Sequence, residues 1–220
     1  MIKTIGLLQR REGLAPAGFR EHYEKNHAPL AIRLLDFPGY QRNYPESDEA
    51  RAALGFDGFS EFWFRDESET AKIGEIMGTE VGAQLLEDEP RFMNVPRNQT
   101  YAVSERLYGT RPEPGKALRA LGITRLPAGT APGKAERELD LDESRVRERR
   151  LPGVLASLFI VPEGASMPLP ADVPAAGCVE SLWLEGRSAL EACNGWRVEV
   201  GAPLLWAVEE SGTPVLAWPY

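Results

Sequence analysis

Four short stretches in the first half of the chain recur in its second half, in the same order. One such match carries little weight, but four in register favour a duplicated domain, and a duplication constrains the fold strongly. The Gly- and Pro-rich stretch GTRPEPG (109–115) is typical of a linker. The sequence therefore predicts two domains within its 220 residues, 1–110 and 111–220. The matched pairs are IGLLQRREGLAP (5–16) with LGITRLPAGTAP (121–132), FPGYQRN (37–43) with LPGVLAS (151–157), FSEFWF (59–64) with VESLWL (179–184), and VGAQLL (81–86) with VGAPLL (200–205).

The first half has the pattern of a ferredoxin-like unit. Its apolar periodicity predicts the order strand, helix, strand, strand, helix, strand. This βαββαβ order belongs to the α+β class, in which helices cover one face of an antiparallel sheet. The expected strands are 2–9, 39–44, 59–65 and 101–107, and the expected helices are 19–35 and 67–77.

Both faces of the predicted sheet are apolar. Along the strand FSEFWFR, Phe59 and Trp63 point to one face while Phe62 and Phe64 point to the other, because strand side chains alternate. Helices can cover one face, and the sheet of the second half can cover the other. We therefore expect two tandem ferredoxin-like domains packed sheet to sheet around a barrel-like core. Such a chain is its own dimer and can be a monomer, although a further homodimer stays open.

Composition excludes several classes of partner. The net charge of −8, without a stripe of Lys and Arg, argues against binding to nucleic acid. No apolar run approaches the roughly 20 residues that span a bilayer, and the N-terminus lacks the pattern of a signal peptide. We therefore expect no membrane association and a cytoplasmic location. Cys178 and Cys193 match no zinc spacing, and reduced thiols are favoured over a disulfide.

The only two histidines, His22 and His27, lie within residues 19–36, and histidine exchanges protons near neutral pH. At about 100° per residue, His27 falls on an apolar helix stripe with Tyr23, whereas His22 falls on a flank that could be solvated. Their spacing of five argues against a shared metal, so no metal site is predicted. Pro29 predicts a kink near residues 26–29. His27 stays open between a site residue and a core histidine, and His22 is interpreted as structural or solvated.

Other candidate site residues lie on or beside the predicted sheet. Glu61 lies among aromatic residues, where burial is expected to raise the pKa of its carboxyl group. With Asp57 and His27 it makes up the predicted catalytic set for acid and base chemistry. Each residue also has a structural interpretation, since strand aromatics often pack in the core and Asp57 with Gly58 can simply form a turn. The predicted substrate-binding residues are Tyr40, Asn43, Trp63, Phe59 and Tyr23.

The first half resembles the EthD family of the dimeric α/β-barrel superfamily over most of residues 1–108. This resemblance rests on GLAPAGFREHYEKNHAPLAIRL, PGYQRN, FDGFSEFWF and EDEPRF, which occur in that order. It implies domains that pair sheet to sheet and activity without a metal or organic cofactor. The family includes an accessory protein of ether degradation, aromatic polyketide-processing enzymes and muconolactone isomerases. It also implies that the histidine of the HAP element, here His27, is the acid and base residue.

The second half departs from this pattern. It contains no histidine, the charged run LDLDESRV (139–146) lies opposite HAPL, and Ser181 lies opposite Glu61. We interpret it as a degenerate copy that completes the barrel, which leaves one site per chain.

Two functions follow as hypotheses. The first is a cofactor-independent isomerase, cyclase, decarboxylase or oxygenase that acts on a small aromatic, polyketide-like or lactone substrate through His27. The second is a non-catalytic small-molecule-binding or accessory protein of a degradation or biosynthesis pathway. Nucleophilic acyl chemistry and phosphate loops are not indicated, since GxSxG, GxxxxGK[ST] and GxGxxG are missing from the sequence.

Overall fold

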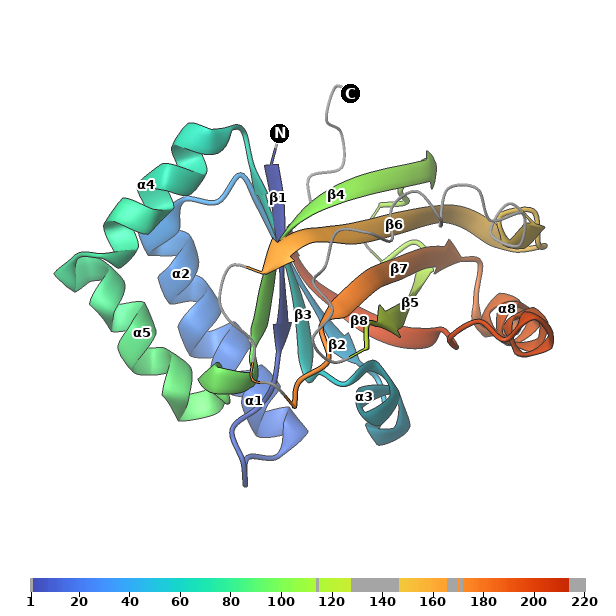
Figure 1. The fold of residues 1–220 in the computed structure, drawn as a ribbon, viewed down its shortest axis with the longest axis horizontal. Coiled ribbons are helices and arrows are strands. Elements are labelled where there is room, and N and C mark those ends of the chain that lie inside the picture. The colour runs from blue at the N-terminus through green and yellow to red at the C-terminus, as the bar shows by residue number, and fades with distance from the viewer. Residues whose placement is uncertain (1, 114, 128–146, 166–169, 171, 214–220) are drawn as a thin grey trace.

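Eight antiparallel strands close into a barrel in the order β1-β3-β2-β8-β5-β7-β6-β4. This computed structural model describes residues 2–113, 115–127, 147–165, 170 and 172–213 (Figure 1). The α+β class and the barrel-like core expected from the sequence are confirmed. The strands are β1 (Ile2–Leu8), β2 (Gly39–Pro45), β3 (Gly58–Phe64), β4 (Gln99–Gly109), β5 (Leu118–Arg125), β6 (Val154–Ala165), β7 (Ala176–Leu184) and β8 (Trp206–Thr213).

Each half contributes four neighbouring strands to the barrel. The first half supplies the run β4-β1-β3-β2 and the second supplies β8-β5-β7-β6, so the strands follow the same relative order in both. The runs join where β2 pairs with β8 and where β4 pairs with β6. The two sheets are therefore not separate layers, because hydrogen bonds continue from one half into the other. The segment predicted as a linker lies between the two runs, since β4 ends at Gly109 and β5 begins at Leu118.

Helices cover the outside of the barrel on two sides. Figure 1 shows α1, α2, α4 and α5 beside the strands of the first half, with α8 on the opposite side. These four helices of the first half therefore form one layer over one face of its sheet, and α3 lies outside this layer. The helical elements are α1 (Pro16–His22), the π-helical turn η1 (Tyr23–His27), α2 (Ala28–Leu35), α3 (Asp48–Leu54), α4 (Glu67–Met77), α5 (Glu80–Phe92), the 3-10 turn η2 (Val95–Arg97) and α8 (Arg187–Val200).

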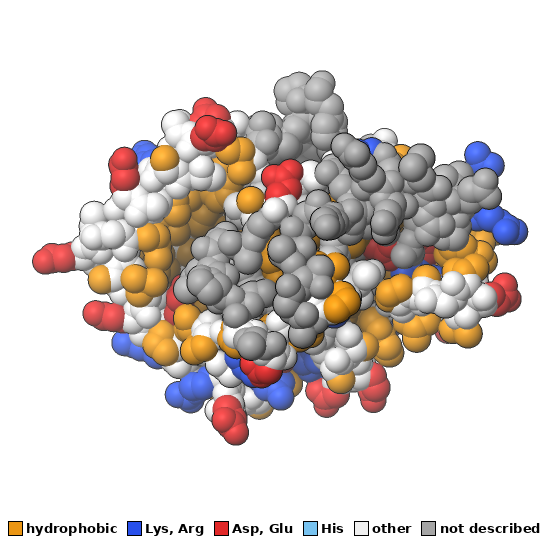
Figure 2. Space-filling model, viewed as in Figure 1, with side chains coloured by type: hydrophobic (Ala, Val, Ile, Leu, Met, Phe, Trp, Pro, Cys, Tyr) orange, Lys and Arg blue, Asp and Glu red, His pale blue; other side chains and the backbone are white. Residues whose placement is uncertain are grey.

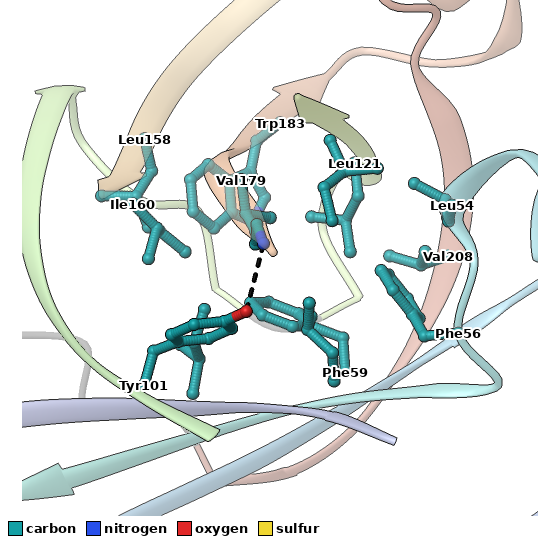
Figure 3. Close-up of a cluster of buried hydrophobic side chains, with 14 of the residues drawn as sticks. Leu54, Phe56, Phe59, Tyr101, Leu121, Leu158, Ile160, Val179, Trp183 and Val208 are labelled. Atoms are coloured by element: carbon teal, nitrogen blue, oxygen red, sulfur yellow. Dashed lines mark hydrogen bonds between the residues drawn. The ribbon is translucent and has the colours of Figure 1, made fainter. Parts of the chain in front are cut away.

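The barrel interior is a shared hydrophobic core. Phe59 and Tyr101 of the first half pack there with Trp183 of the second half (Figure 3). The Tyr101 hydroxyl accepts a hydrogen bond from the Ala176 amide at 3.1 Å, which links the two halves directly. A second cluster lies between the first-half sheet and its helices, and includes Phe19 and Phe92. The two faces of the sheet are thus buried against different partners, as their alternating apolar residues predict.

Some details differ from the sequence predictions. Helices α3 and α5 are additional to the two helices expected in the first half. The match of VGAQLL to VGAPLL does not join equivalent elements, because residues 81–86 lie within α5 whereas residues 200–205 lie at the end of α8 and in the loop before β8. The run LDLDESRV (139–146) lies outside the described residues. Cys178 and Cys193 are both buried free thiols, as predicted. In the described part of the chain, no helix is long and apolar enough to cross a membrane.

Candidate functional site

A cavity of about 310 Å³ lies between the first-half sheet and its helices. Figure 2 shows hydrophobic side chains gathered in a hollow beside α4 and α5. Most of the lining is apolar, and the polar groups are few, which is typical of sites for small organic molecules. The lining includes the aromatic residues Phe37, Phe62 and Phe64, the methionines Met77 and Met93, and the polar residues Thr4, Tyr23, His27, Tyr40, Glu89, Asn98 and Thr100.

A π-helical turn positions the histidines. The backbone follows one helical path from Pro16 to Leu35, but over Tyr23–His27 the hydrogen bonds skip one residue, so that the Ala28 amide donates to the Tyr23 carbonyl. Pro29 lacks an amide hydrogen and its ring crowds the preceding turn, which accounts for the irregular turn at this place. The predicted kink near residues 26–29 is thereby located at residues 23–27.

Both histidines bind the same carboxylate. His27 Nδ1 lies 3.1 Å from Asp88 Oδ2, and His22 Nε2 lies 2.9 Å from Asp88 Oδ1. The prediction that the two rings point apart is wrong, because it assumed 100° per residue throughout, whereas a π turn carries an extra residue and brings positions five apart onto one side. His22 is half-buried and stacks on Phe92 with ring centroids 4.7 Å apart.

Asp88 fixes which nitrogen of His27 carries the proton. An ionised carboxylate only accepts hydrogen bonds, so Nδ1 of His27 is the protonated nitrogen and Nε2 keeps its lone pair. His27 is 7% exposed. Burial lowers its pKa below the ordinary value, and the hydrogen bond and charge of Asp88 oppose that shift only in part. The ring is therefore neutral at neutral pH and available as a base.

Two tyrosines lie beside His27 in the cavity wall. Tyr40 donates a hydrogen bond to the Tyr23 hydroxyl at 2.6 Å, and that hydroxyl lies 2.7 Å from Ser60 Oγ. Burial raises the pKa of both tyrosines, so both hydroxyls stay protonated. The Tyr40 ring stacks on Phe62, with centroids 4.6 Å apart. The structure thus brings three predicted site residues together, namely His27, Tyr23 and Tyr40.

The structure places the other sheet residues on the opposite face from His27. Phe59 packs inside the barrel core. Trp63 packs against charged groups of the interior, with Lys3 Nζ 4.7 Å from the centroid of the Trp63 ring. Glu61 is fully buried there, 2.8 Å from Lys3 Nζ and 2.7 Å from Arg119 Nη1, and it accepts a hydrogen bond from Asn43 at 2.9 Å. The reason is strand alternation, since residues 59, 61 and 63 share one face and the cavity lies over the other.

The expected rise in the pKa of Glu61 is wrong. Burial alone would raise it, but the positive charges of Arg119, Lys3 and Arg111 outweigh that effect and hold the pKa well below its usual range. Glu61 is therefore ionised and paired.

Asp57 lies apart from both groups. Its carboxylate accepts hydrogen bonds from the Arg10 guanidinium at 2.8 Å and from the Arg10 amide at 2.9 Å. It ties the end of β1 to the loop before β3, and it does not line the cavity that holds His27.

Two site residues are absent from the predicted set, namely Asp88, which binds both histidines, and Glu89, which lines the cavity. Both lie in EDEPRF, but no helix was expected there, so the sequence offered no face on which to place them. Glu89 lines the cavity and is half-buried. Burial and the neighbouring charge of Asp88 raise the pKa of its carboxyl group. Within the described residues, no group of three or more His, Cys, Asp or Glu is placed to hold a metal ion.

The corresponding layer of the second half is filled by charged side chains. Arg197 of α8 binds Glu180 of β7 at 2.7 Å and Glu148 at 3.0 Å, and all three residues are buried. In the sequence match, Glu180 lies opposite Ser60. Long charged side chains therefore fill space on this side, whereas a short serine lies beneath Tyr23 on the other.

One comparison with a solved structure supports this architecture. Among solved structures, one titled an anthrone oxidase-like protein is similar over 100% of this chain and 96% of its own, at 11% identity, with a TM-score of 0.61. At that identity the likeness shows a shared fold. A candidate monooxygenase from Lactobacillus acidophilus NCFM has 11% identity, covers 97% of this chain and 95% of its own, and has a TM-score of 0.48. A chlorite dismutase variant from Candidatus Nitrospira defluvii has 10% identity, 94% and 90% coverage, and a TM-score of 0.45.

Sequence comparisons bear on the half that carries the cavity. A search of curated proteins finds no match to this chain. Residues 11–96 match the family model of the EthD domain. These residues include the helix with His27, strands β2 and β3, and the helix with Asp88 and Glu89. The resemblance of the first half to the EthD family is therefore confirmed over residues 11–96.

Proposed function

We propose that this chain is a cofactor-independent enzyme in which His27 takes and returns a proton on a small aromatic, polyketide-like or lactone substrate. The observation that carries this proposal is the neutral, buried His27 held by Asp88 beside an apolar cavity of about 310 Å³. A base whose pKa lies below neutral pH is in its working form at neutral pH. A carboxylate that orients such a base also stabilises the imidazolium formed when the proton is taken.

The wall of the cavity supports a flat, apolar substrate. Phe62 and Tyr40 present stacked rings, and Phe37 packs against Phe62 with centroids 5.1 Å apart. The volume lies at the lower end of the range for small-molecule sites, about 300 to 1,000 Å³. A compound of two or three fused rings fits this description, and a C–H next to a carbonyl is the natural proton for His27 to remove.

The domain arrangement extends this proposal. Residues 1–110 would form the ferredoxin-like domain that carries the site, and residues 111–220 a degenerate repeat that completes the barrel. The shared strand order of the two halves supports this history. So does the buried group of Arg197, Glu180 and Glu148 in place of a hollow. One site per chain follows, and the internal pairing allows the chain to act as a monomer.

The test uses 2-tetralone, an aromatic ketone with acidic C–H bonds. In D2O, the protein should accelerate exchange of the C–H between ring and carbonyl, followed by NMR. His27→Ala should return the rate to background while the melting temperature changes little, because Asp88 keeps its contact with His22. Lys25→Ala changes an exposed position in the same turn and is the matched control. This variant should accelerate the exchange of 2-tetralone as much as the wild type does.

Wild-type exchange that persists in the His27→Ala variant would contradict the proposal. If the wild type binds 2-tetralone but does not accelerate exchange, the protein is instead a small-molecule-binding or accessory protein. That second function shares the apolar cavity but does not use the Asp88 and His27 pair as acid and base.

A further inference from the structure

Glu89 places a carboxyl group in a largely apolar cavity. It lines the same space as His27, Tyr40 and Phe62. Among the described residues, no hydrogen bond or ion pair to its side chain is found, although the adjacent Asp88 binds both histidines. A carboxyl group with a purely structural role is normally hydrogen-bonded, ion-paired or in contact with water. The Glu89 carboxyl group is therefore available to bind a ligand.

The helix explains how neighbouring carboxyls reach different places. Residues 88 and 89 of α5 differ in direction by about 100°. Asp88 faces the helix that carries the histidines, whereas Glu89 lies one turn after Leu85 and shares the cavity with it. Because consecutive Cα atoms lie about 3.8 Å apart, Glu89 starts close to the carboxylate that holds His27. A ligand beside His27 is therefore within reach of Glu89.

An apolar, half-buried carboxyl next to the negative charge of Asp88 is favoured in its neutral form, in which it donates a hydrogen bond. The polar tyrosine hydroxyls of the cavity are already used, since Tyr40 donates to Tyr23 and Tyr23 lies against Ser60. The Thr4 and Thr100 hydroxyls of the cavity can also donate, but Glu89 is the carboxylic acid that can transfer its proton to a carbonyl oxygen.

We infer that Glu89 is a second catalytic residue, a general acid that protonates the carbonyl oxygen of an aromatic ketone while His27 removes the adjacent carbon-bound proton. This rests on the proposed function of His27 and names the substrate class, an enolisable ketone on a planar ring system. The C–H electron pair becomes the new C=C bond, and the C=O π pair takes the proton of Glu89. The products of this step are the neutral enol, the His27 imidazolium and the Glu89 carboxylate.

The reverse transfers return both protons. The imidazolium protonates the same carbon, or a conjugated carbon of the enol, and the carboxylate removes the O–H proton. The net reaction is a tautomerisation or a double-bond shift, with no oxidant or reductant required. The enol is the intermediate that the cavity would hold most tightly, because it offers an O–H and a flat apolar body.

Two variants separate hydrogen bonding from proton transfer. Glu89→Gln keeps a donor of the same shape but cannot give up a proton, and Glu89→Leu removes both abilities. The probes are 2-naphthol, which resembles the enol, and naphthalene, which lacks its hydroxyl. Glu87→Gln, an exposed position on the same helix, is the matched control.

The wild type, Glu87→Gln and Glu89→Gln should bind 2-naphthol about tenfold more tightly than naphthalene, as one hydrogen bond allows. Glu89→Leu should bind the two equally. Exchange of 2-tetralone should fall about 100-fold in Glu89→Gln, the scale of one general acid, and remain unchanged in Glu87→Gln.

The outcomes also separate this inference from the proposed function. If His27→Ala loses exchange while Glu89→Gln keeps the wild-type rate, the acid role of Glu89 is overturned and the proposed role of His27 as the base is retained. If Glu89→Leu still prefers 2-naphthol as the wild type does, Glu89 does not touch the ligand and the inference fails. Binding is measured without turnover, so it decides the contact with Glu89 even where no exchange is seen.

Discussion

The chemistry proposed for this chain depends on one carboxylate and the ring that it orients. Asp88 accepts from Nδ1 of His27 and thereby keeps Nε2 as the base. Burial and Asp88 act in opposite directions on the pKa of His27, and burial is the larger effect. His27 must be neutral to work, so activity should fall as the pH drops through its pKa.

Asp88→Asn tests the opposing effects of burial and of the Asp88 charge on the pKa of His27. The variant removes the charge that raises the pKa of His27, so that pKa should fall further, and the acid side of the pH profile should move to lower pH. The exchange rate should drop about 10- to 100-fold, the usual cost of losing the group that orients a functional histidine. NMR titration of the His27 ring measures the pKa, with Glu87→Gln as the control. An unchanged pKa would show that Asp88 does not govern this ring.

Sequence reasoning left His27 open between a site residue and a core histidine and separated it from His22, whereas the structure places His27 in the cavity lining and both rings on Asp88. Helical phase at 100° per residue holds only for a regular α-helix, and the π turn at Tyr23–His27 breaks that assumption. Pro29 predicted an irregularity in this helix but did not predict that it is a π-helical turn. Glu61 shows the other limit, because its pKa depends on Lys3 and Arg119, which are distant in the sequence.

At the scale of elements, helices α4 and α5 form the outer wall of the cavity. Ile73 and Met77 of α4 and Leu85 of α5 all line it. The first turn of α5 packs tightly on the end of α4 at Gly82, where an added Cβ would lie 2.4 Å from the Ile76 carbonyl oxygen. Helix α4 was predicted from its apolar spacing, whereas α5 was not, and its residues 81–86 match a stretch that is mostly a loop in the second half.

Gly82→Ala should therefore separate α4 from α5. The clash is with backbone atoms, which cannot rotate away, so we expect a loss of about 1 to 3 kcal/mol in the free energy of unfolding and weaker binding of 2-naphthol. Gly74→Ala in α4 is the matched control, because nothing lies within 4 Å of its added Cβ. That change should stabilise the helix by up to about 1 kcal/mol. Denaturant unfolding and ligand titration check both, and equal stability of the two variants would contradict this account of the hairpin.

At the scale of the whole molecule, the two halves share one interior. Lys3 and Glu61 of the first half meet Arg119 of the second inside the barrel. Strand pairing also crosses between the halves at two places. The alternation of apolar residues in β3 predicted that both faces are buried. It could not predict which strands pair between the halves, because the sequence of one strand does not specify its pairing partner.

Glu61→Gln tests the buried charge network. Removing one charge leaves Arg119 and Lys3 without their full compensation, which should cost about 3 to 5 kcal/mol in the free energy of unfolding. The pKa of Glu61 is lowered in the folded state. Its stabilisation is therefore present above the unfolded pKa, near 4.3, and is lost as the pH falls below it. Urea unfolding at several pH values should show a shallower acid dependence in the variant.

The control is Glu209→Gln, which removes an exposed ion pair with Arg20. Surface pairs contribute about 0 to 1 kcal/mol, so this variant should unfold much like the wild type. Exchange of 2-tetralone per folded molecule should persist in Glu61→Gln, since Glu61 lies on the far side of the sheet from His27. Loss of exchange in a folded Glu61→Gln protein would return Glu61 to the catalytic set.

A fragment of residues 1–110 tests the dependence of one half on the other. Without β5 to β8, the barrel face of its sheet would expose Ile5, Leu7 and Phe59 to water, all of them buried in the full chain. We expect the fragment to dimerise or aggregate, and light scattering measures its mass. A monomeric fragment with cooperative unfolding would show that the halves are independent.

The most direct test of the central claim is a crystal structure of the protein soaked with 2-naphthol. The account predicts the ring system between the first-half helices and sheet, stacked near Phe62, with its hydroxyl within hydrogen-bond distance of Glu89 and its edge beside His27 Nε2. Density for the compound inside the barrel, or beside α8 in the second half, with this cavity empty, would contradict it.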